Sequence, residues 1–322
     1  MADATGILSA MGVKDLASWG ATWITVDELI PFETEGITQA YTRIADESLT
    51  GVAGRYPSDQ GVQAVVGPTT HALDYNNYDT IFEMLFGTKS TRTFTLSNDI
   101  LAKYVGIELD KGASRWRFNA AKATKGILSG EVDQHVKLNT DWIIRDLSDK
   151  SGTAFPLDSS DLAGPRAKVR FEDLDFWLID IASGPPAAGD RMRISSFELE
   201  IDNVLVPDDY ASKTGTPGEE KFPLEPIRNG FRVVNFKIGL PRYDADTFPV
   251  WKAADTPLQA KLTFTRGSET LTIDLPDLRI SEGADVNIAG PERLQQEVAF
   301  EVNYPETGNS QYDGGEVRAV FT

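Results

Sequence analysis

The stretch RFNAAKATKGILSG (residues 117–130), followed by HVKL (135–138) and WII (142–144), decides how this chain folds. Its apolar and β-branched residues predict a long strand, a turn and a second strand. A similar pattern returns in TIDLPDLRISEG (272–283), which leads to EVAFEV (297–302). Both stretches predict a hairpin, and the recurrence points to an internal duplication.

Two patterns upstream of these hairpins also recur. WITVDELIP (23–31) resembles LEIDNVLVP (199–207) in its alternation and its closing proline. Gly67 and Gly239 each close an apolar strand that a short helical stretch follows. The order of predicted elements is therefore the same in the two halves of the chain.

Helices are predicted at only two places. Residues 78–86 have apolar side chains at helical spacing and stop at Gly87, a residue that favours helix ends. A second helix is expected from about residue 247 to residue 254, where Thr247 can cap the first turn and Pro249 lies within it. The fold class is mainly β: two tandem β-sandwich or barrel domains, each with a short flanking α-helix, plus extended arms and loops.

Irregular segments set the expected domain boundaries. The first β domain takes residues 1–150, including an N-terminal arm that reaches to about residue 21. Residues 151–190, which begin in a stretch rich in Gly, Pro, Ser and Asp, are predicted to be a linker or insertion. The second β domain takes residues 191–322, and its polar segment 208–221 is expected to form a long exposed loop.

Composition limits the classes of function. The chain has 322 residues, a length typical of about two domains. The absence of cysteine excludes disulfides, thiol nucleophiles and thiolate metal sites. A net charge of −18 opposes tight binding to DNA or RNA through phosphate contacts. No apolar run is long enough to span a bilayer, and no secretory signal is expected.

The sequence offers no catalytic or cofactor-binding motif. Its two histidines, His71 in an expected turn and His135 in an expected strand, have no catalytic partners near them in the sequence. Metal-ligand spacings and phosphate-binding glycine loops do not occur. The prediction is a protein that is not an enzyme and that needs no cofactor or metal.

The remaining evidence is the order and spacing of the elements. Five segments carry it: residues 11–21, 29–32, 47–51, 61–67 and 79–87. In this order and spacing the chain resembles the tail tube (major tail) proteins of long, non-contractile-tailed bacteriophages, the siphophages. The resemblance covers about the first 150 residues, and the second half follows as a degenerate repeat.

This resemblance implies a structural virion protein whose subunits form rings. The rings stack into the hollow tail tube through which double-stranded DNA leaves the capsid. Because family members with one such domain form hexameric rings, a chain with two copies is expected to form a trimeric, pseudo-hexameric ring. Expected partners are other copies of the chain, the tail-tip and tail-terminator proteins, and the tape-measure protein in the lumen. Assembly is expected in the host cytoplasm, without membrane insertion.

The acidic composition suggests a role for the lumen surface. Because strand residues alternate between two faces, carboxylates on one face could repel the phosphates of passing DNA over a screening length of about 8 Å. The candidate lumen-facing residues are Glu198, Glu200, Asp202, Glu297, Glu301, Glu108 and Asp110. The alternative is that these are ordinary solvated faces of an antiparallel sheet.

The N-terminal arm and the polar loop are the candidates for contacts between stacked rings. The loop residues proposed for this contact are Asp208, Asp209, Tyr210, Lys213, Glu219, Glu220 and Lys221. Other roles stay open: a tail terminator, a capsid decoration protein, or a ligand-binding β-sandwich module. In the last of these, Trp116, Trp177 or Trp251 would stack on a ligand, although their surroundings favour packing in the core.

Overall fold

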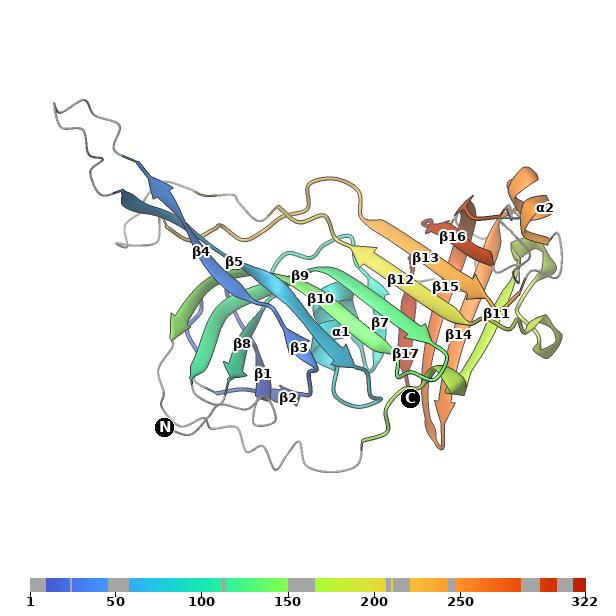
Figure 1. The fold of residues 1–322 in the computed structure, drawn as a ribbon, viewed down its shortest axis with the longest axis horizontal. Helices are drawn as coiled ribbons and strands as arrows, with labels where there is room; N and C mark the ends of the chain where they lie inside the picture. Colours follow the sequence, from blue (N-terminus) through green and yellow to red (C-terminus); the bar gives the residue numbers. More distant parts are fainter. Residues whose placement is uncertain are drawn as a thin grey trace, which may run out of the picture.

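The computed structural model describes residues 10–23, 25–45, 58–111, 114–149, 166–206, 210, 221–242, 247–284, 296–305 and 315–322. The fold is mainly β, as predicted, and antiparallel pairing joins its strands (Figure 1). The described residues contain two α-helices, α1 (Asp79–Phe86) and α2 (Thr247–Ala253). Three short 3₁₀ helices lie at Phe171–Asp173, Ile181–Ser183 and Ala188–Asp190.

The first half of the chain forms ten strands. They are β1 (Ala10–Asp15), β2 (Glu28–Ile30), β3 (Thr34–Glu35), β4 (Thr38–Ile44), β5 (Asp59–Ala72), β6 (Gly87–Ser90), β7 (Thr93–Leu96), β8 (Val105–Asp110), β9 (Arg115–Glu131) and β10 (Lys137–Asp149). Hydrogen-bonded pairing links six of them in the order β4, β5, β10, β9, β8 and β1. Helix α1 lies between β5 and β8 in the chain.

The second half repeats this order of pairing. Its strands are β11 (Leu174–Asp180), β12 (Ser196–Asp202), β13 (Val233–Leu240), β14 (Leu258–Arg266), β15 (Glu269–Glu282), β16 (Gln296–Val302) and β17 (Arg318–Phe321). Pairing links six of them in the order β12, β13, β16, β15, β14 and β11. Helix α2 lies between β13 and β14, so each helix occupies the same place in the order.

Irregularities in the ladders recur as well. The β8–β9 register shifts by one residue within residues 105–107, and the β14–β15 register does so within residues 258–260. The long strands also have bulges in the ladders with their other neighbours, β10 and β16. Thr124 of β9 and Ser281 of β15 are bulged there, because each has no partner although the residues on both sides of it are paired. Bulges of this kind bend a strand and pin its register.

The two halves join edge to edge. Residues 115–121 of β9 pair with β8, and residues 125–131 pair with β12 of the second half. One continuous antiparallel sheet results, in the order β4, β5, β10, β9, β12, β13, β16 and β15, which we call the eight-stranded sheet (Figure 1). Within the part of the chain that the structure describes, its outer edges are β4 and the end of β15.

One apolar core lies beneath this sheet and runs through both halves. Phe197, Leu199 and Ile201 point inward from β12 and are buried. Phe197 packs against Phe171 and Phe264, with ring centroids 6.2 and 5.7 Å apart. Burial of such side chains contributes about 1.5–3 kcal/mol each, so the joint between the halves is part of the folding core.

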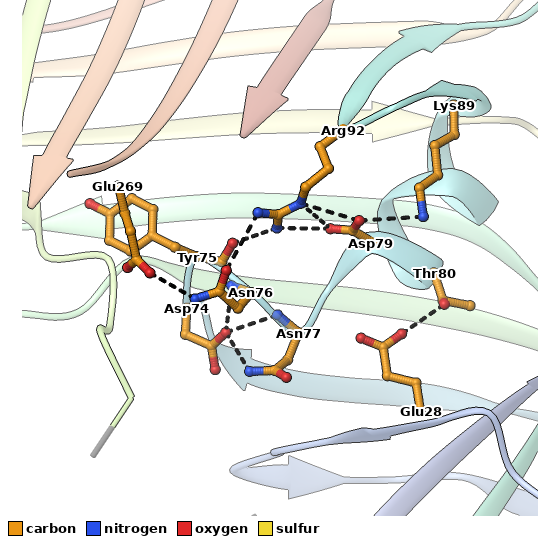
Figure 2. Close-up of polar contacts among 10 residues, drawn as sticks. All are labelled: Glu28, Asp74, Tyr75, Asn76, Asn77, Asp79, Thr80, Lys89, Arg92 and Glu269. Atoms are coloured by element: carbon orange, nitrogen blue, oxygen red, sulfur yellow. Dashed lines mark hydrogen bonds and ion pairs between the residues drawn. The ribbon is translucent and has the colours of Figure 1, made fainter. Parts of the chain in front are cut away.

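A polar junction ties the start of α1 to the second half (Figure 2). The Asp74 carboxylate accepts hydrogen bonds from the backbone N–H groups of Asn76 and Asn77, each at 3.0 Å. The side-chain amide of Asn76 donates to Glu269 on β15 at 2.8 Å. This contact joins the segment before α1 to the start of β15, which is far from it in the sequence.

Arg92, in the turn between β6 and β7, completes the junction. Its guanidinium donates to both oxygens of Asp79 at 2.9–3.2 Å and to the carbonyl of Tyr75 (Figure 2). It also lies over the Phe321 ring, at 5.0 Å from the ring centroid. An arginine in this fork geometry holds a carboxylate more rigidly than a lysine does. The junction therefore fixes α1 against the C-terminal strand β17.

Glu28, next to α1, is half-buried. The Thr80 hydroxyl donates to it at 2.8 Å (Figure 2), but burial raises the pKa of Glu28 from 4.5 to about 7. Between these two values the folded chain binds a proton that the unfolded chain releases, so the free energy of unfolding falls as the pH rises through this window.

The substitution Glu28→Gln should remove this pH dependence. The glutamine oxygen can still accept the Thr80 bond, so the variant should match the native chain at pH 4.5 and exceed its free energy of unfolding by about 1–2 kcal/mol at pH 8. Urea denaturation at both pH values measures the difference. The exposed Glu301→Gln substitution is the control and should change neither value; equal stability of Glu28→Gln and native chain at pH 8 would refute the assignment.

Several local predictions are confirmed. Helix α1 ends at Gly87, which has φ 90° and donates its N–H to the Glu83 carbonyl, a conformation that favours glycine. Helix α2 starts at Thr247 as expected. In addition to these predicted features, the structure places Gly267, with φ 66°, in the tight turn between β14 and β15. Residues 117–130 lie in β9, which pairs with β10, and residues 272–282 lie in β15, which pairs with β16.

Other predictions are wrong. Residues 10–15 form the buried strand β1, which pairs with β2 and β8, so the expected N-terminal arm does not include them; residues 1–9 lie outside the described residues. The segment expected to be a linker or insertion, 151–190, contains the strand β11, which pairs with β14, and the domain boundaries stay a prediction. Gly67 lies inside β5 and does not close it.

The likeness between residues 23–31 and 199–207 does not reflect equivalent positions. Strand β12 pairs with β13 as β4 pairs with β5, whereas β2, within residues 23–31, pairs with β1. The segment equivalent to β12 is therefore β4 together with β3. Alternating strands of the same length resemble one another whatever their partners.

Candidate functional site

The candidate site is the outer face of the eight-stranded sheet. On β12, Glu198, Glu200 and Asp202 are half-buried and alternate with the buried apolar residues of the core. The predicted alternation is confirmed here, because successive side chains of a strand point to opposite faces. These three carboxylates therefore point away from the core.

Two further predicted acidic residues share this face. Glu301 lies two strands away from Glu200, with Asn235 of β13 paired between them. Glu297 lies on the same side of β16, where it alternates with buried Val298 and Phe300. The structure thus brings five of the seven predicted carboxylates onto one face.

The sequence patterns missed the lysines of this face. The Lys125 ammonium on β9 binds Glu200 at 2.8 Å, and this hydrogen bond raises the pKa of Lys125. Lys237 on β13 lies 3.5 Å from Glu198. Solvent-accessible pairs of this kind contribute at most about 1 kcal/mol each. The face is consequently a mixed-charge surface, and no local motif signals which lysine meets which carboxylate, since the pairs come from strands far apart in the sequence.

The balance of charge on the face is still acidic. Asp141 on β10 pairs with Lys125 in the ladder, and burial raises its pKa. Lys137 on the same strand forms an ion pair with Glu33 at 3.0 Å. The strands of this face carry the carboxylates Glu198, Glu200, Asp202, Glu297, Glu301 and Asp141 and the cations Lys125, Lys137, Lys237 and Arg279, the last directly opposite Glu301 in the ladder. An acidic excess weakens binding of a polyanion but does not exclude a close approach.

Glu108 and Asp110 lie elsewhere. Both belong to β8, which pairs with the other half of β9. Glu108 is 1% exposed and forms an ion pair with Arg117 at 3.2 Å, and Asp110 lies 3.7 Å from Arg115. The structure therefore does not bring these two carboxylates together with the other five.

The predicted loop contact residues are described only in part. The Tyr210 hydroxyl donates to the carbonyl of Gln63 on β5 at 2.7 Å, which brings this point of the segment against the β4–β5 hairpin. Lys221 is half-buried. The other five proposed residues, Asp208, Asp209, Lys213, Glu219 and Glu220, lie outside the described residues.

The histidines differ in their surroundings. His71 lies in β5 and not in a turn; it is buried, and burial lowers its pKa to about 4. Its ring nitrogens contact the Pro31 carbonyl and the Thr69 hydroxyl, both at 2.9 Å. His135 is exposed in an isolated bridge with Arg170. Both of the His71 ring nitrogens are engaged within the core.

Two of the three tryptophans pack as expected. Trp116 and Trp251 contact the core, and Trp177 lies under the Arg191 guanidinium at 5.3 Å. Over the described ranges, no three His, Asp or Glu side chains gather as a metal site would require. None of the helices in those ranges is both long and apolar enough to cross a membrane.

The free edges of the eight-stranded sheet are the second candidate surface, and no sequence pattern indicated that β4 and the end of β15 would form them. Strand β4 pairs with β5 on one side only, among the residues that the structure describes, and most of its residues are exposed. At the opposite edge, Ser281, Glu282 and Gly283 are exposed where β15 runs beyond the start of β14. Unpaired strand edges of this kind are templates for strand addition.

Comparison with known proteins identifies the family. A family model described as phage tail tube protein matches residues 6–302, nearly the whole chain. No curated protein matches it. The matched range contains the first sixteen strands and both helices, so it covers both halves of the eight-stranded sheet. This chain belongs to the phage tail tube protein family.

Proposed function

We propose that the chain is the major tail tube subunit of a long, non-contractile-tailed phage and that it carries two tandem tail-tube-like units. Membership of the family makes it a structural tail tube protein and a virion component. The observation that carries the proposal of two units is the repeated order of strand pairing, with bulges at Thr124 and Ser281 in equivalent strands. Independent folds rarely share both order and irregularities.

In this proposal three chains form a ring of six similar units. The β9–β12 joint already arranges two units edge to edge within one chain, and repetition of the same rotation closes a ring without free edges. Rings stack into a tube around a lumen for double-stranded DNA and the tape-measure protein. Tail-tip and tail-terminator proteins cover its two ends, and assembly takes place in the host cytoplasm.

The outer face of the eight-stranded sheet is proposed to line the lumen. Its acidic excess would keep the DNA backbone from binding, and its ion pairs, such as Lys125 with Glu200, would moderate the repulsion. Within about 8 Å of the surface this repulsion acts on passing phosphates at physiological salt. Segment 208–221 and the N-terminal residues are proposed to contact the next ring.

The ring stoichiometry gives a direct test. Purified protein at high concentration should form rings or tubes that show six lobes in electron micrographs, while native mass spectrometry or analytical ultracentrifugation gives three chains per ring. Rings of six chains would refute the two-unit count. A chain that stays monomeric under all conditions of concentration and salt would refute the tube assignment itself.

A further inference from the structure

We propose that strand β4 of one copy adds to the free end of β15 in the next copy, antiparallel and in the same register as the β9–β12 joint within the chain. The partner is a second copy of this chain, and the contact is head to tail. This proposal rests on the two-unit reading of the proposed function and adds to it a specific interface.

The joint inside the chain is the template. Seven residues of β12 pair with β9, from Ser196 opposite Glu131 to Asp202 opposite Lys125. Beyond the last pair, the backbone N–H of Asn203 donates to the carbonyl of the bulged Thr124 at 2.8 Å. The β9–β12 pairing therefore starts next to the bulge at Thr124 and continues along β9 to Glu131.

The bulges align the two units residue by residue. Lys122 lies two positions before the bulge at Thr124, and Arg279 lies two positions before the bulge at Ser281. In each unit, paired residues form a row across four strands, which ends on β4 in the first unit and on β12 in the second. The first row is Lys122, Ile143, Val66 and Thr38, and the second is Arg279, Glu301, Asn235 and Glu200. Thr38 of β4 thus has the place that Glu200 has in β12.

The receiving edge aligns in the same way. Strand β12 lies beside β9 beyond Ala121, where pairing with β8 ends. In the second unit, pairing of β15 with β14 ends at Leu278, and the chain continues past Ser281 to Ala284. Among the described residues no strand pairs with β15 on this side beyond Leu278.

The pairing of β12 with β9, applied to β4 of one copy and β15 of the next, predicts one register. Asp202 opposite Lys125 becomes Ala40 of one copy opposite Glu282 of the next. The bond from Asn203 to Thr124 becomes a bond from the Tyr41 N–H to the Ser281 carbonyl. Because the bulge can accept only one alignment, a slip by one residue would turn the side chains of β4 to the wrong face.

The donor edge has unpaired groups in the required direction. The N–H of Gly36 donates to the Pro68 carbonyl of β5 at 2.9 Å, so odd-numbered residues from here on direct their N–H groups to the open side. The Ile37 N–H accordingly meets no strand and donates instead to the carboxylate of Glu35 at 3.1 Å, which Lys111 holds at 2.6 Å. The Glu35 side chain thus binds a backbone N–H group that a carbonyl of a neighbouring strand could otherwise bind.

The joint between copies would be less apolar than the joint within the chain. The inward positions of β12 are Phe197, Leu199 and Ile201. Their equivalents along the donor edge are Glu35, Ile37 and Gln39, of which only Ile37 is apolar. Backbone hydrogen bonds therefore supply more of the contact, as in other cases of strand addition. A weaker joint lets the folded monomer exist before it assembles.

Engineered cysteines test this register. The chain has no cysteine, so any disulfide is the engineered one. Residues 40 and 282 form a pair without direct backbone bonds, for which Cα atoms lie about 4.5 Å apart, within disulfide range. Within one chain they lie at opposite edges of the eight-stranded sheet, on the order of 30 Å apart at about 4.8 Å per strand, so a link must join two copies.

The experiment mixes two single variants of the full chain, Ala40→Cys and Glu282→Cys, under mild oxidation. The mixture should give covalent dimers on non-reducing gels, and each variant alone should give none. Gln39→Cys mixed with Glu282→Cys is the matched control and should also give none, because residue 39 points to the other face. Linked Ala40→Cys alone would indicate β4 pairing with β4 and would overturn the proposal.

The outcome separates this proposal from the proposed function. If rings or tubes form in electron micrographs but the Ala40→Cys and Glu282→Cys mixture does not link, the β4–β15 joint is wrong and the tube assignment stands. Equal linking by the Gln39→Cys control overturns the register. If the variants and the native chain all stay monomeric and unlinked, both the joint and the tube assignment are wrong.

Discussion

The substitution Gln39→Pro should leave the chain folded but monomeric. The Gln39 N–H points to the open side of β4, so proline removes no bond of the β4–β5 ladder. Proline has no backbone N–H, so the hydrogen bond to a carbonyl of β15 in the next copy is lost, and the proline ring would keep the two strands apart. Assembly into rings or tubes should therefore be lost at concentrations where the native chain assembles.

Sedimentation velocity measures this loss, and thermal unfolding measures whether the monomer is intact. Gln39→Ala is the matched control and should assemble, because it keeps the N–H. Thr38→Pro is a second comparison: its N–H faces Val66 of β5, so it should lower the stability of the monomer as well. Normal rings from Gln39→Pro would show that β4 is not the edge used between copies.

The substitution Glu225→Ala should destabilise the folded monomer. Lys122 of β9 is 2% exposed, and its ammonium binds the Glu225 carboxylate at 2.6 Å and the carbonyl of Ile100 at 3.0 Å. Burial lowers the pKa of Lys122, so the charge depends on its partner. Removal of the carboxylate leaves the buried ammonium with backbone carbonyls but no opposite charge, and we expect the free energy of unfolding to fall by about 3 kcal/mol.

Urea denaturation of a double-mutant cycle separates the ion pair from packing. The variant Lys122→Met keeps the volume of the side chain without its charge. Combined with Glu225→Ala, it should regain most of the lost stability, since no unpaired charge remains buried. Additive losses in the double variant would indicate that Glu225 acts through other contacts of the segment that leads into β13.

Local elements could be predicted because their signals lie close together in the sequence. The α1 helix has apolar residues at helical spacing and a glycine that accepts positive φ, and both are readable without knowledge of the fold. The hairpins of the long strands are also local, with Gly267 at a tight turn. The sequence therefore predicted the strands β9, β10, β15 and β16 and the polar face of β12.

Partners of strands could not be predicted in this way. The β9–β12 joint pairs residues that are distant in the sequence, such as Ser129 and Glu198, and no pattern in either strand indicates that the other is its partner. Glu108 alternates with apolar neighbours like any surface residue, yet it is buried and paired with Arg117 of β9, a strand whose place beside β8 no local pattern indicates. The first residues of β1 read as an arm because their burial comes wholly from these distant partners.

The β9–β12 joint has a consequence for the kinetics of assembly. Since the peptide chain connects its two sides, this joint forms at a rate that does not depend on protein concentration, and dilution cannot separate it. Only the contacts between chains respond to concentration. In the proposed ring of three two-unit chains, every fragment therefore contains an even number of units, and joining the chains takes two bimolecular steps where six single-unit subunits would take five.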